Sequence, residues 1–271
     1  MIANWVSRTS VHLEIMKKAF KVSVTYKINT LFEFLSIGFD FFIQICVWTA
    51  LYNGRNLVNG VSLSDMISYV MVSSFVSSLS YSGIALKIAN QVKDGTIGNE
   101  LCRPINYKDM IMYHEIGANL FHSICIRLPV VLLFGFLIKV VIPASGLNFL
   151  LFFISVIFGI TIVYGLNFIY GMLAFWLKTS EYVNFISRAL MTLFAGRFVP
   201  IWFYPEFLKK IGQVLPFRFI TFEPMQIYLG KVDSHQTLVI LLSQVIWIAA
   251  LTIIQQIMWK AVQKHLVIQG G

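Results

Sequence analysis

Long apolar segments separated by short polar intervals fill most of the chain. Each segment is close to the roughly 20 residues that a helix needs to cross a bilayer. The pattern predicts an all-α polytopic membrane protein with six transmembrane helices and one membrane domain over residues 1–271. The length of the fourth segment favours a tilt, or a bend at Gly159, Gly165 or Gly171. The predicted spans lie near 29–52, 65–88, 113–138, 148–177, 182–203 and 237–259.

The stretch 4–22 has an amphipathic pattern instead of a uniformly apolar one. At 100° per residue its large apolar side chains share one face, and its positive charges lie away from that face. Such a helix lies in the plane of the bilayer interface. We therefore predict an interfacial helix within residues 1–27, directly before the first span. The apolar face comprises Trp5, Val6, Leu13, Met16 and Phe20, and the charges are Arg8, Lys18 and Lys21.

Composition supports the membrane class. The chain is 58% hydrophobic and 12% charged, whereas a soluble domain has about 25% charged residues. The net charge of +9 is better explained by lysines and arginines that anchor cytoplasmic loops than by nucleic-acid binding. The cysteines and histidines have no metal-ligand or disulfide spacing, and no catalytic constellation is visible. We expect no metal site, no cofactor in this chain and no enzymatic activity of its own.

Lysine and arginine are distributed unequally between the two sets of loops. If the N-terminus is inside the cell, each short outer loop carries one basic residue, and most of the others fall in cytoplasmic segments. The positive-inside rule then places both termini and the interval 87–110 in the cytoplasm. Three arginines, Arg127, Arg188 and Arg197, remain at membrane depth.

Polar residues form a stripe on the first predicted span and shorter stripes on the third and fifth. Their spacing of three and four residues places them on one helical face. Carboxylates facing lipid are costly, so the stripes face protein, water or cargo. Two interpretations stay open: a cargo path favouring cations or polar amphiphiles, or an internal network in which Asp40 or Glu33 pairs with Arg127 or Arg188. The candidate cargo-path residues are Glu33, Asp40, Gln44, Glu115, Asn119 and Arg188.

The interval 87–110 is the most charged part of the chain and separates the second and third predicted spans. Asp94-Gly95 is typical of a turn, because glycine tolerates a positive φ and aspartate bonds its own backbone. Thr96 can cap a short helix that Pro104 ends near Arg103. The segment is either a solvated connector or a docking element for a partner in the aqueous phase.

The predicted outer loop 200–236 is long and rich in proline. The stretch FLKKIGQVL has apolar residues at helical spacing and predicts a short amphipathic helix at the outer interface. A second short element is expected over 219–229. Loops of this length are often functional, so the segment either covers an exit path or is a folded surface loop. The candidate cap residues are Tyr204, Pro205, Glu206, Pro216, Glu223 and Pro224.

Three features in this order resemble the permease subunit of an ABC-2 type exporter whose permease and ATPase are separate chains. They are an interfacial helix before six spans, the motif DGTIGNELCRP between spans two and three, and PIWFYPEFLKKIGQVLPFRFITFEP between spans five and six. The resemblance covers nearly the whole chain. It implies a coupling helix in the first motif and re-entrant helices capping the translocation path in the second. The implied ATPase-coupling residues are Asp94, Gly95, Thr96, Ile97, Glu100, Leu101, Arg103 and Pro104.

The resemblance also implies an assembly in a bacterial inner membrane. The chain has no G-x-x-x-x-G-K-[ST] phosphate loop, so ATP and Mg²⁺ are expected in two partner ATPase subunits. A second permease is expected, more often a different chain than an identical one, with the lipid bilayer around both. The alternative is an ion-coupled secondary transporter that uses intramembrane carboxylates. It usually has internal repeats and broken helices, and neither is visible in this sequence.

Overall fold

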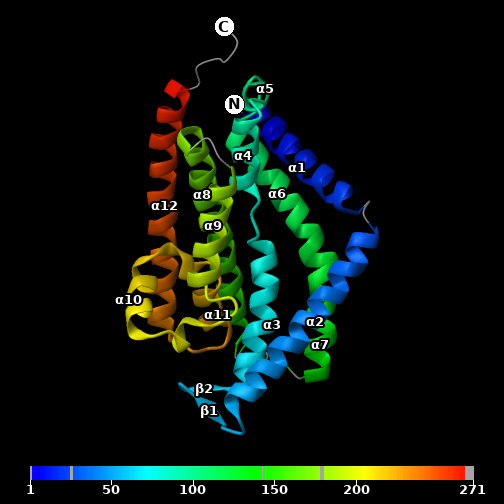
Figure 1. Ribbon diagram of the computed structural model, residues 1–271, viewed down its shortest axis with the longest axis vertical. Helices are drawn as coiled ribbons and strands as arrows, with labels where there is room; N and C mark the ends of the chain where they lie inside the picture. The colour runs from blue at the N-terminus through cyan, green and yellow to red at the C-terminus, as the bar shows by residue number, and fades with distance from the viewer. Residues whose placement is uncertain are drawn as a thin grey trace.

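The computed structural model describes residues 2–24, 27–138, 140–141, 143, 145–177 and 180–265. These residues form an elongated bundle of helices (Figure 1). One end, which we call the α5 end, holds the start of α1 (Ile2–Val24), the short helix α5 (Ile97–Leu101) and the last turns of α12 (Ser234–His265). The opposite end, the hairpin end, holds a small antiparallel hairpin of β1 (Leu57–Val58) and β2 (Val61–Ser62).

Five helical stretches in the described part of the chain are long and apolar enough to cross a membrane. This confirms an all-α polytopic membrane fold, whereas the count of six spans stays a prediction. The uninterrupted stretches are α2 (Lys27–Tyr52), α8 (Gly146–Leu177) and α12. A fourth consists of α6 (Tyr107–Phe121), a π-helical turn (His122–Arg127) and α7 (Leu128–Ile138). The fifth combines α3 (Leu63–Leu79) and α4 (Ile84–Lys93).

The second predicted span, 65–88, falls within the membrane-length stretch Leu63–Lys93, but this stretch is not one continuous helix. Residues Ser80–Gly83 are not helical and separate α3 from α4 (Figure 1). The expectation that the chain has no broken helix is corrected with it. The break forms because polar side chains of α6, far away in the sequence, supply hydrogen bonds to its backbone.

The fifth predicted span, 182–203, was also too long. Helix α9 (Ser180–Phe194) ends before Gly196, whose φ of +72° lies outside the helical region. The phenol of Tyr69 on α3 donates a hydrogen bond to the carbonyl oxygen of Gly196 at 2.5 Å. This bond and the left-handed glycine turn the chain away from the helix axis. With 15 residues, α9 is shorter than the roughly 20 that a straight span needs.

Helix α8 is unbroken through the three glycines at which a bend was considered. A methyl group on Gly159 would lie 2.9 Å from the carbonyl oxygen of Phe219, and one on Gly171 would lie 2.8 Å from a side-chain carbon of Ile88. These glycines therefore allow close approach of neighbouring elements. They place α8 directly against α4 and against the segment that follows α9.

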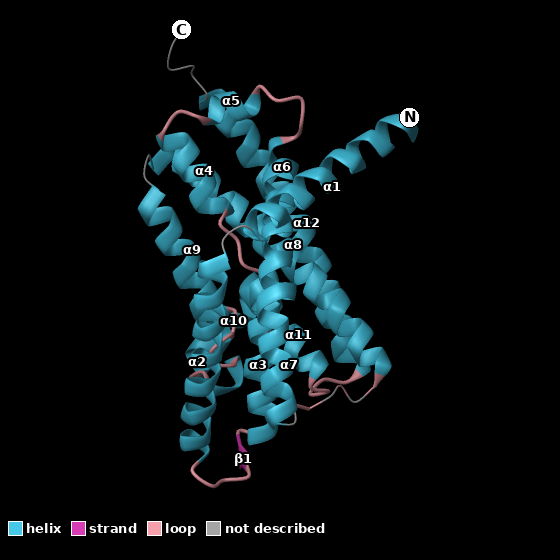
Figure 2. Ribbon diagram, turned by 90° about the vertical axis from the view of Figure 1, so that its right-hand side faces the viewer, coloured by secondary structure: helices cyan, strands magenta, loops and turns pink. Residues whose placement is uncertain are grey.

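The amphipathic helix α1 runs obliquely along the upper part of α6 (Figures 1 and 2). A methyl group on Gly117 of α6 would overlap the backbone of Met16, and the rings of His12 and Tyr113 stack with centroids 4.4 Å apart. The helix predicted for this stretch therefore packs on α6 along one side. Its position in the bilayer interface stays a prediction.

The segment after α9 folds into four short helical pieces near the hairpin end (Figure 1). The amphipathic helix expected from FLKKIGQVL is α10, and its apolar residues Phe207, Ile211 and Val214 face outward. In contrast, α11 is almost entirely buried. The pieces are a 3-10 turn (Ile201–Phe203), α10 (Glu206–Val214), a second 3-10 turn (Pro216–Phe219) and α11 (Phe222–Tyr228).

Candidate functional site: the helix break, its cavity and the α5 end

Two predicted cargo-path residues hold the break between α3 and α4. A carboxylate oxygen of Glu115 accepts a hydrogen bond from the backbone N–H of Gly83 at 3.1 Å. The amide nitrogen of Asn119 donates to the carbonyl oxygen of Tyr81 at 2.5 Å and contacts the Tyr164 hydroxyl at 2.9 Å. The backbone groups that the break frees inside the bundle therefore have partners.

Gly83 is the N-cap of α4 and has no side chain to cap the helix. The first turn of a helix carries a partial positive charge from its free N–H groups. The Glu115 carboxylate lies at this position and offsets that charge. In the structure the Glu115 carboxylate therefore stabilises the start of α4. A role for Glu115 in binding cargo stays a prediction.

The polar stripe on α2 contacts other side chains, whereas Glu115 and Asn119 bond the backbone of the break. A carboxylate oxygen of Glu33 lies 2.9 Å from Nδ1 of His122. Asp40 lies within Coulombic range of Arg127 and Arg197. No direct ion pair joins Glu33 or Asp40 to an arginine in the described part of the chain, so the proposed pairs with Arg127 or Arg188 were wrong as direct contacts. Gln44 is half-buried on the same helix.

A cavity of about 340 Å³ lies beside the break. It is bordered by the end of α3, the break itself, α8, α9 and the residues after α9. Two arginines, Arg188 and Arg197, line it. Ser77 and Ser80 also line it, and their hydroxyl oxygens are buried without a hydrogen-bond partner. Buried polar atoms nearly always have partners, so this cavity has unused hydrogen-bonding capacity.

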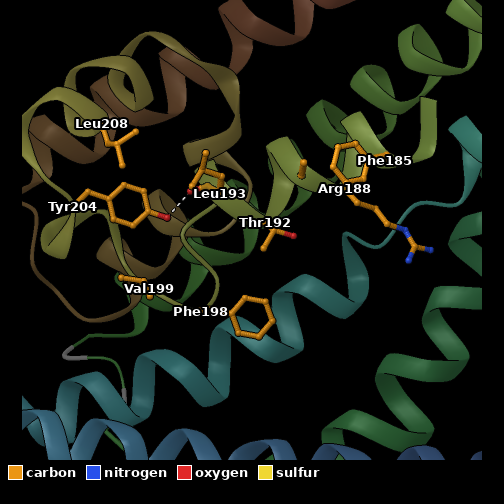
Figure 3. A pocket seen from close by; sticks show the side chains of 9 residues that line it. Phe185, Arg188, Thr192, Leu193, Phe198, Val199, Tyr204 and Leu208 are labelled. Atoms are coloured by element: carbon orange, nitrogen blue, oxygen red, sulfur yellow. Dashed lines mark hydrogen bonds between the residues drawn. The ribbon is translucent and has the colours of Figure 1, made fainter. Parts of the chain in front are cut away.

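The arginines come from different elements. Arg188, on α9, extends toward the break, where its guanidinium lies 3.4 Å from the Tyr81 hydroxyl (Figure 3). Arg197 follows the end of α9, and its guanidinium lies 4.6 Å from the centre of the Phe198 ring. On the α3 side, Arg127 donates a hydrogen bond to the Ser74 hydroxyl at 2.5 Å.

An open apolar groove of about 800 Å³ adjoins this cavity (Figure 3). Arg188, Thr192 and Phe198 line both. The groove runs along α9 from Phe185 to Leu193 and extends to Leu208 of α10, and its lining is mainly aliphatic and aromatic. Together the two spaces present positive charge and hydroxyl groups at one end and an apolar wall at the other.

The predicted coupling segment forms the tip of the α5 end (Figures 1 and 2). Gly95 has a φ of +70°, as the predicted turn requires. The side chain of Thr96 makes no capping hydrogen bond, so its proposed role as a side-chain cap was wrong. Ile97 is buried, whereas Glu100 and Arg103 form an ion pair at 3.0 Å. Asp94 and Pro104 are exposed, and Leu101 is half-buried.

Helix α4 connects this tip to the break. Its Ala85 and Ala89 pack against Ala174 of α8 and Val183 of α9, and small residues of this kind allow helices to approach closely. Helix α4 therefore links α5 to the break and is packed against α8 and α9.

The predicted cap residues lie near the hairpin end in a well-bonded segment. Glu223 is buried, 3.4 Å from the Arg218 guanidinium, and accepts a hydrogen bond from Gln226 at 2.6 Å. Burial raises the pKa of Glu223, while Arg218 and Gln226 oppose that shift. The Tyr204 hydroxyl donates a hydrogen bond to the carbonyl oxygen of Leu193. Pro216 and Pro224 are buried, whereas Pro205 and Glu206 are exposed.

A sequence model of the family described as ABC-2 family transporter protein matches residues 39–270. The chain belongs to this family. A search of curated proteins finds no match. The ABC-2 assignment makes the chain a membrane permease of an ABC transporter, a transport component that functions with ABC ATPase partners. No group of His, Cys, Asp and Glu side chains in the described part of this permease could hold a metal ion.

Sequence patterns found part of this site. Arg188 and Asn119 were singled out by helical spacing, and Arg197 only as a charge at membrane depth. No sequence pattern singled out Ser77 or Ser80 as site residues. Their role as cavity walls depends on the break, for which the local sequence provides no glycine or proline signal before Gly83.

Proposed function

We propose that this ABC-2 permease exports cargo in a bacterial inner membrane, with two ATPase subunits coupled through the 87–110 segment. The observation that carries the proposal is the continuous connection from α5 to the cavity. The tip is charged and exposed, Ile97 anchors it, and α4 extends from it to the helix break. Closure of the ATPase pair would move α5, and the packed α4 would transmit this motion to the cavity.

The orientation follows from the same segment. An ATPase works in the cytoplasm, so the α5 end, with the start of α1 and the last turns of α12, faces inward. The hairpin end then faces outward, and the segment from Ile201 to Tyr228 covers the outer side of the path. Cys102 is exposed at the α5 end, and an impermeant thiol reagent applied to whole cells should not modify it. A cysteine introduced at Asn59 should react, and the opposite result would reverse the orientation.

A second permease would complete the path. Only 17% of the α2 span is buried within the chain, although it carries Glu33, Asp40 and Gln44. Charged residues at membrane depth rarely face lipid, so we expect a partner subunit to pack against the exposed face of α2. The resemblance favours a different permease chain over a second copy.

The alternative of an ion-coupled secondary transporter draws on the break and on the Glu33–His122 pair. Both are features that proton-coupled carriers use. Membership of the ABC-2 family favours the ATP-driven mechanism, in which the pair is an internal contact.

The deciding experiment compares matched charge reversals at the two ends. Glu100–Arg103 on the α5 side and Glu206–Lys209 on α10 are both ion pairs three residues apart. Arg103→Glu should reduce recovery of the ATPase subunits with affinity-purified permease by roughly tenfold, because docking charges fix register at an interface. Lys209→Glu should leave recovery unchanged.

Both variants should accumulate in the membrane like the unmodified chain, since exposed ion pairs contribute little to folding. Equal recovery of the ATPase with both variants would show that the α5 tip is a solvated connector.

A further inference from the structure

The polar cavity beside the break and the apolar groove along α9 form one amphiphilic site. We propose that it binds an anionic amphiphile, with a phosphate or carboxylate head group in the cavity and an apolar tail in the groove. This proposal depends on the proposed function in one respect: it takes the bound amphiphile to be the exported cargo.

The charge of the cavity is the first argument. Arg188 and Arg197 line it, and Arg127 lies within Coulombic range of Arg197. Asp40 lies within range of both Arg197 and Arg127. Glu33 contacts His122 and also lies within range of Arg127. The described residues that line the cavity thus include two arginines and no carboxylate, although Glu115 lies behind the break at Gly83. An isolated guanidinium at membrane depth is costly, and an anion would offset the cost.

The hydrogen-bonding capacity of the walls is an independent argument. Ser80 is 6% exposed, and its hydroxyl oxygen has no partner. The hydroxyl oxygen of Ser77 is also buried without a hydrogen-bond partner, and Ser77 lines the same cavity. Other polar side chains nearby bond one another, such as Ser187 and Asn167 at 2.7 Å. Two unpartnered hydroxyls and two guanidinium groups, all from residues that line one cavity, are the kinds of donor that the oxygens of a phosphate or carboxylate require.

The groove specifies the rest of the ligand. Arg188, Thr192 and Phe198 form the boundary between the two spaces. In Figure 3 the Arg188 side chain extends away from Tyr204 and Leu208, so its charge lies apart from the apolar wall. A tail in the groove would contribute about 0.8 kcal/mol per buried CH₂ group. An anion without a tail would lose this contribution.

From the sequence we expected a cargo path that favours cations, because Glu33 and Asp40 lie in the polar stripe on α2. The Glu33 carboxylate has a histidine partner, and Asp40 lies near arginines. The charged residues that line the cavity, Arg188 and Arg197, are therefore opposite in sign to those of the stripe.

The test is direct binding of radiolabelled dodecyl phosphate to the full chain in phosphatidylcholine nanodiscs. Binding should be saturable. Arg188→Gln and Arg197→Gln should each weaken it by about tenfold or more, as expected for a lost charged hydrogen bond. Arg197→Lys should retain more binding than Arg197→Gln. The control Arg55→Gln removes an exposed arginine near the hairpin and should have no effect.

Competition identifies the chemistry. Dodecanoate should displace the probe, whereas inorganic phosphate should need at least about a hundredfold higher concentration. Dodecyltrimethylammonium should not compete. Displacement by this cation as strong as by dodecanoate would overturn the anionic assignment, and inorganic phosphate as effective as dodecyl phosphate would overturn the amphiphile.

Wild-type affinity in Arg188→Gln would also overturn the site. This variant decides the matter even if Arg197→Gln does not accumulate, because the Arg188 side chain is exposed and has one long hydrogen bond. The assay contains no ATPase subunit, so its failure is separate from a failure of ATPase docking.

Discussion

The two ends of the molecule differ in how their polar groups find partners. At the α5 end, Glu100 and Arg103 pair with each other three residues apart, and within the described part of the chain the Arg103 side chain otherwise hydrogen-bonds only the nearby Met110 sulfur, at 3.9 Å. At the hairpin end, polar groups bond across the fold: Lys231 pairs with Asp65 of α3 at 2.7 Å, and Asn59 donates to the Trp202 carbonyl oxygen at 3.4 Å. The hairpin end is thus closed by its own chain. The α5 end keeps its charges available for a partner.

Two glycines allow the sharpest comparison of the ends, because both have φ near +70°. A methyl group on Gly196 would lie 3.1 Å from Cβ of Phe222, whereas one on Gly95 meets no atom within 4 Å. Gly196→Val combines backbone strain with overpacking and should cost roughly 2–5 kcal/mol of folding free energy. Gly95→Val carries strain alone and should cost about 1–2 kcal/mol.

The measurement is membrane accumulation together with the thermal unfolding midpoint in detergent. Gly196→Val should fail to accumulate or unfold at a much lower temperature. Gly95→Val should accumulate and lose ATPase recovery. Equal stability of the two variants would remove the distinction between the ends.

The Gly95 turn was predictable from sequence because its cause is local: Asp-Gly followed by a short helix and proline. The amphipathic α10 was predictable for the same reason, since Phe207, Ile211 and Val214 repeat at helical spacing. The break at Ser80–Gly83 was not predictable in this way. It depends on Glu115 and Asn119, which are more than 30 residues away and also fit a continuous α6 face.

Helix α9 illustrates the same limit at the candidate site. Apolar residues continue past Phe194, so the pattern predicts a longer helix than the one that forms. The hydrogen bond from Tyr69 and the close contact with Phe222 select the turn at Gly196. That turn brings Arg197 to the same cavity as Arg188, a juxtaposition absent from either local pattern.

A medium effect is expected from the ion pair between Lys231 and Asp65. Their side chains are 29% and 18% exposed, so solvent screens the pair in part. Lys231→Glu should lower the free energy of unfolding by about 1 kcal/mol. Arg103→Glu, at the more exposed pair of the α5 end, should have a smaller effect on the unfolding midpoint. The double exchange Asp65→Lys with Lys231→Asp should recover stability, and no recovery would mean that the pair does not tie this end together.

The smallest expected effect is the pH dependence contributed by Glu223. Burial raises the pKa of its carboxyl above the ordinary 4.5 in the folded chain. The folded state therefore keeps the Glu223 proton up to a higher pH than the unfolded state does. The stability that this protonated carboxyl contributes is fully present below about pH 4.5 and is lost as the pH rises through the folded-state pKa. Glu223→Gln should remove this downward slope of the unfolding midpoint. Glu206→Gln, which removes an exposed carboxylate of the same segment, should leave the slope in place. A slope unchanged by Glu223→Gln would mean that the Arg218 guanidinium compensates the buried charge fully, so that the hairpin end keeps this carboxylate ionised.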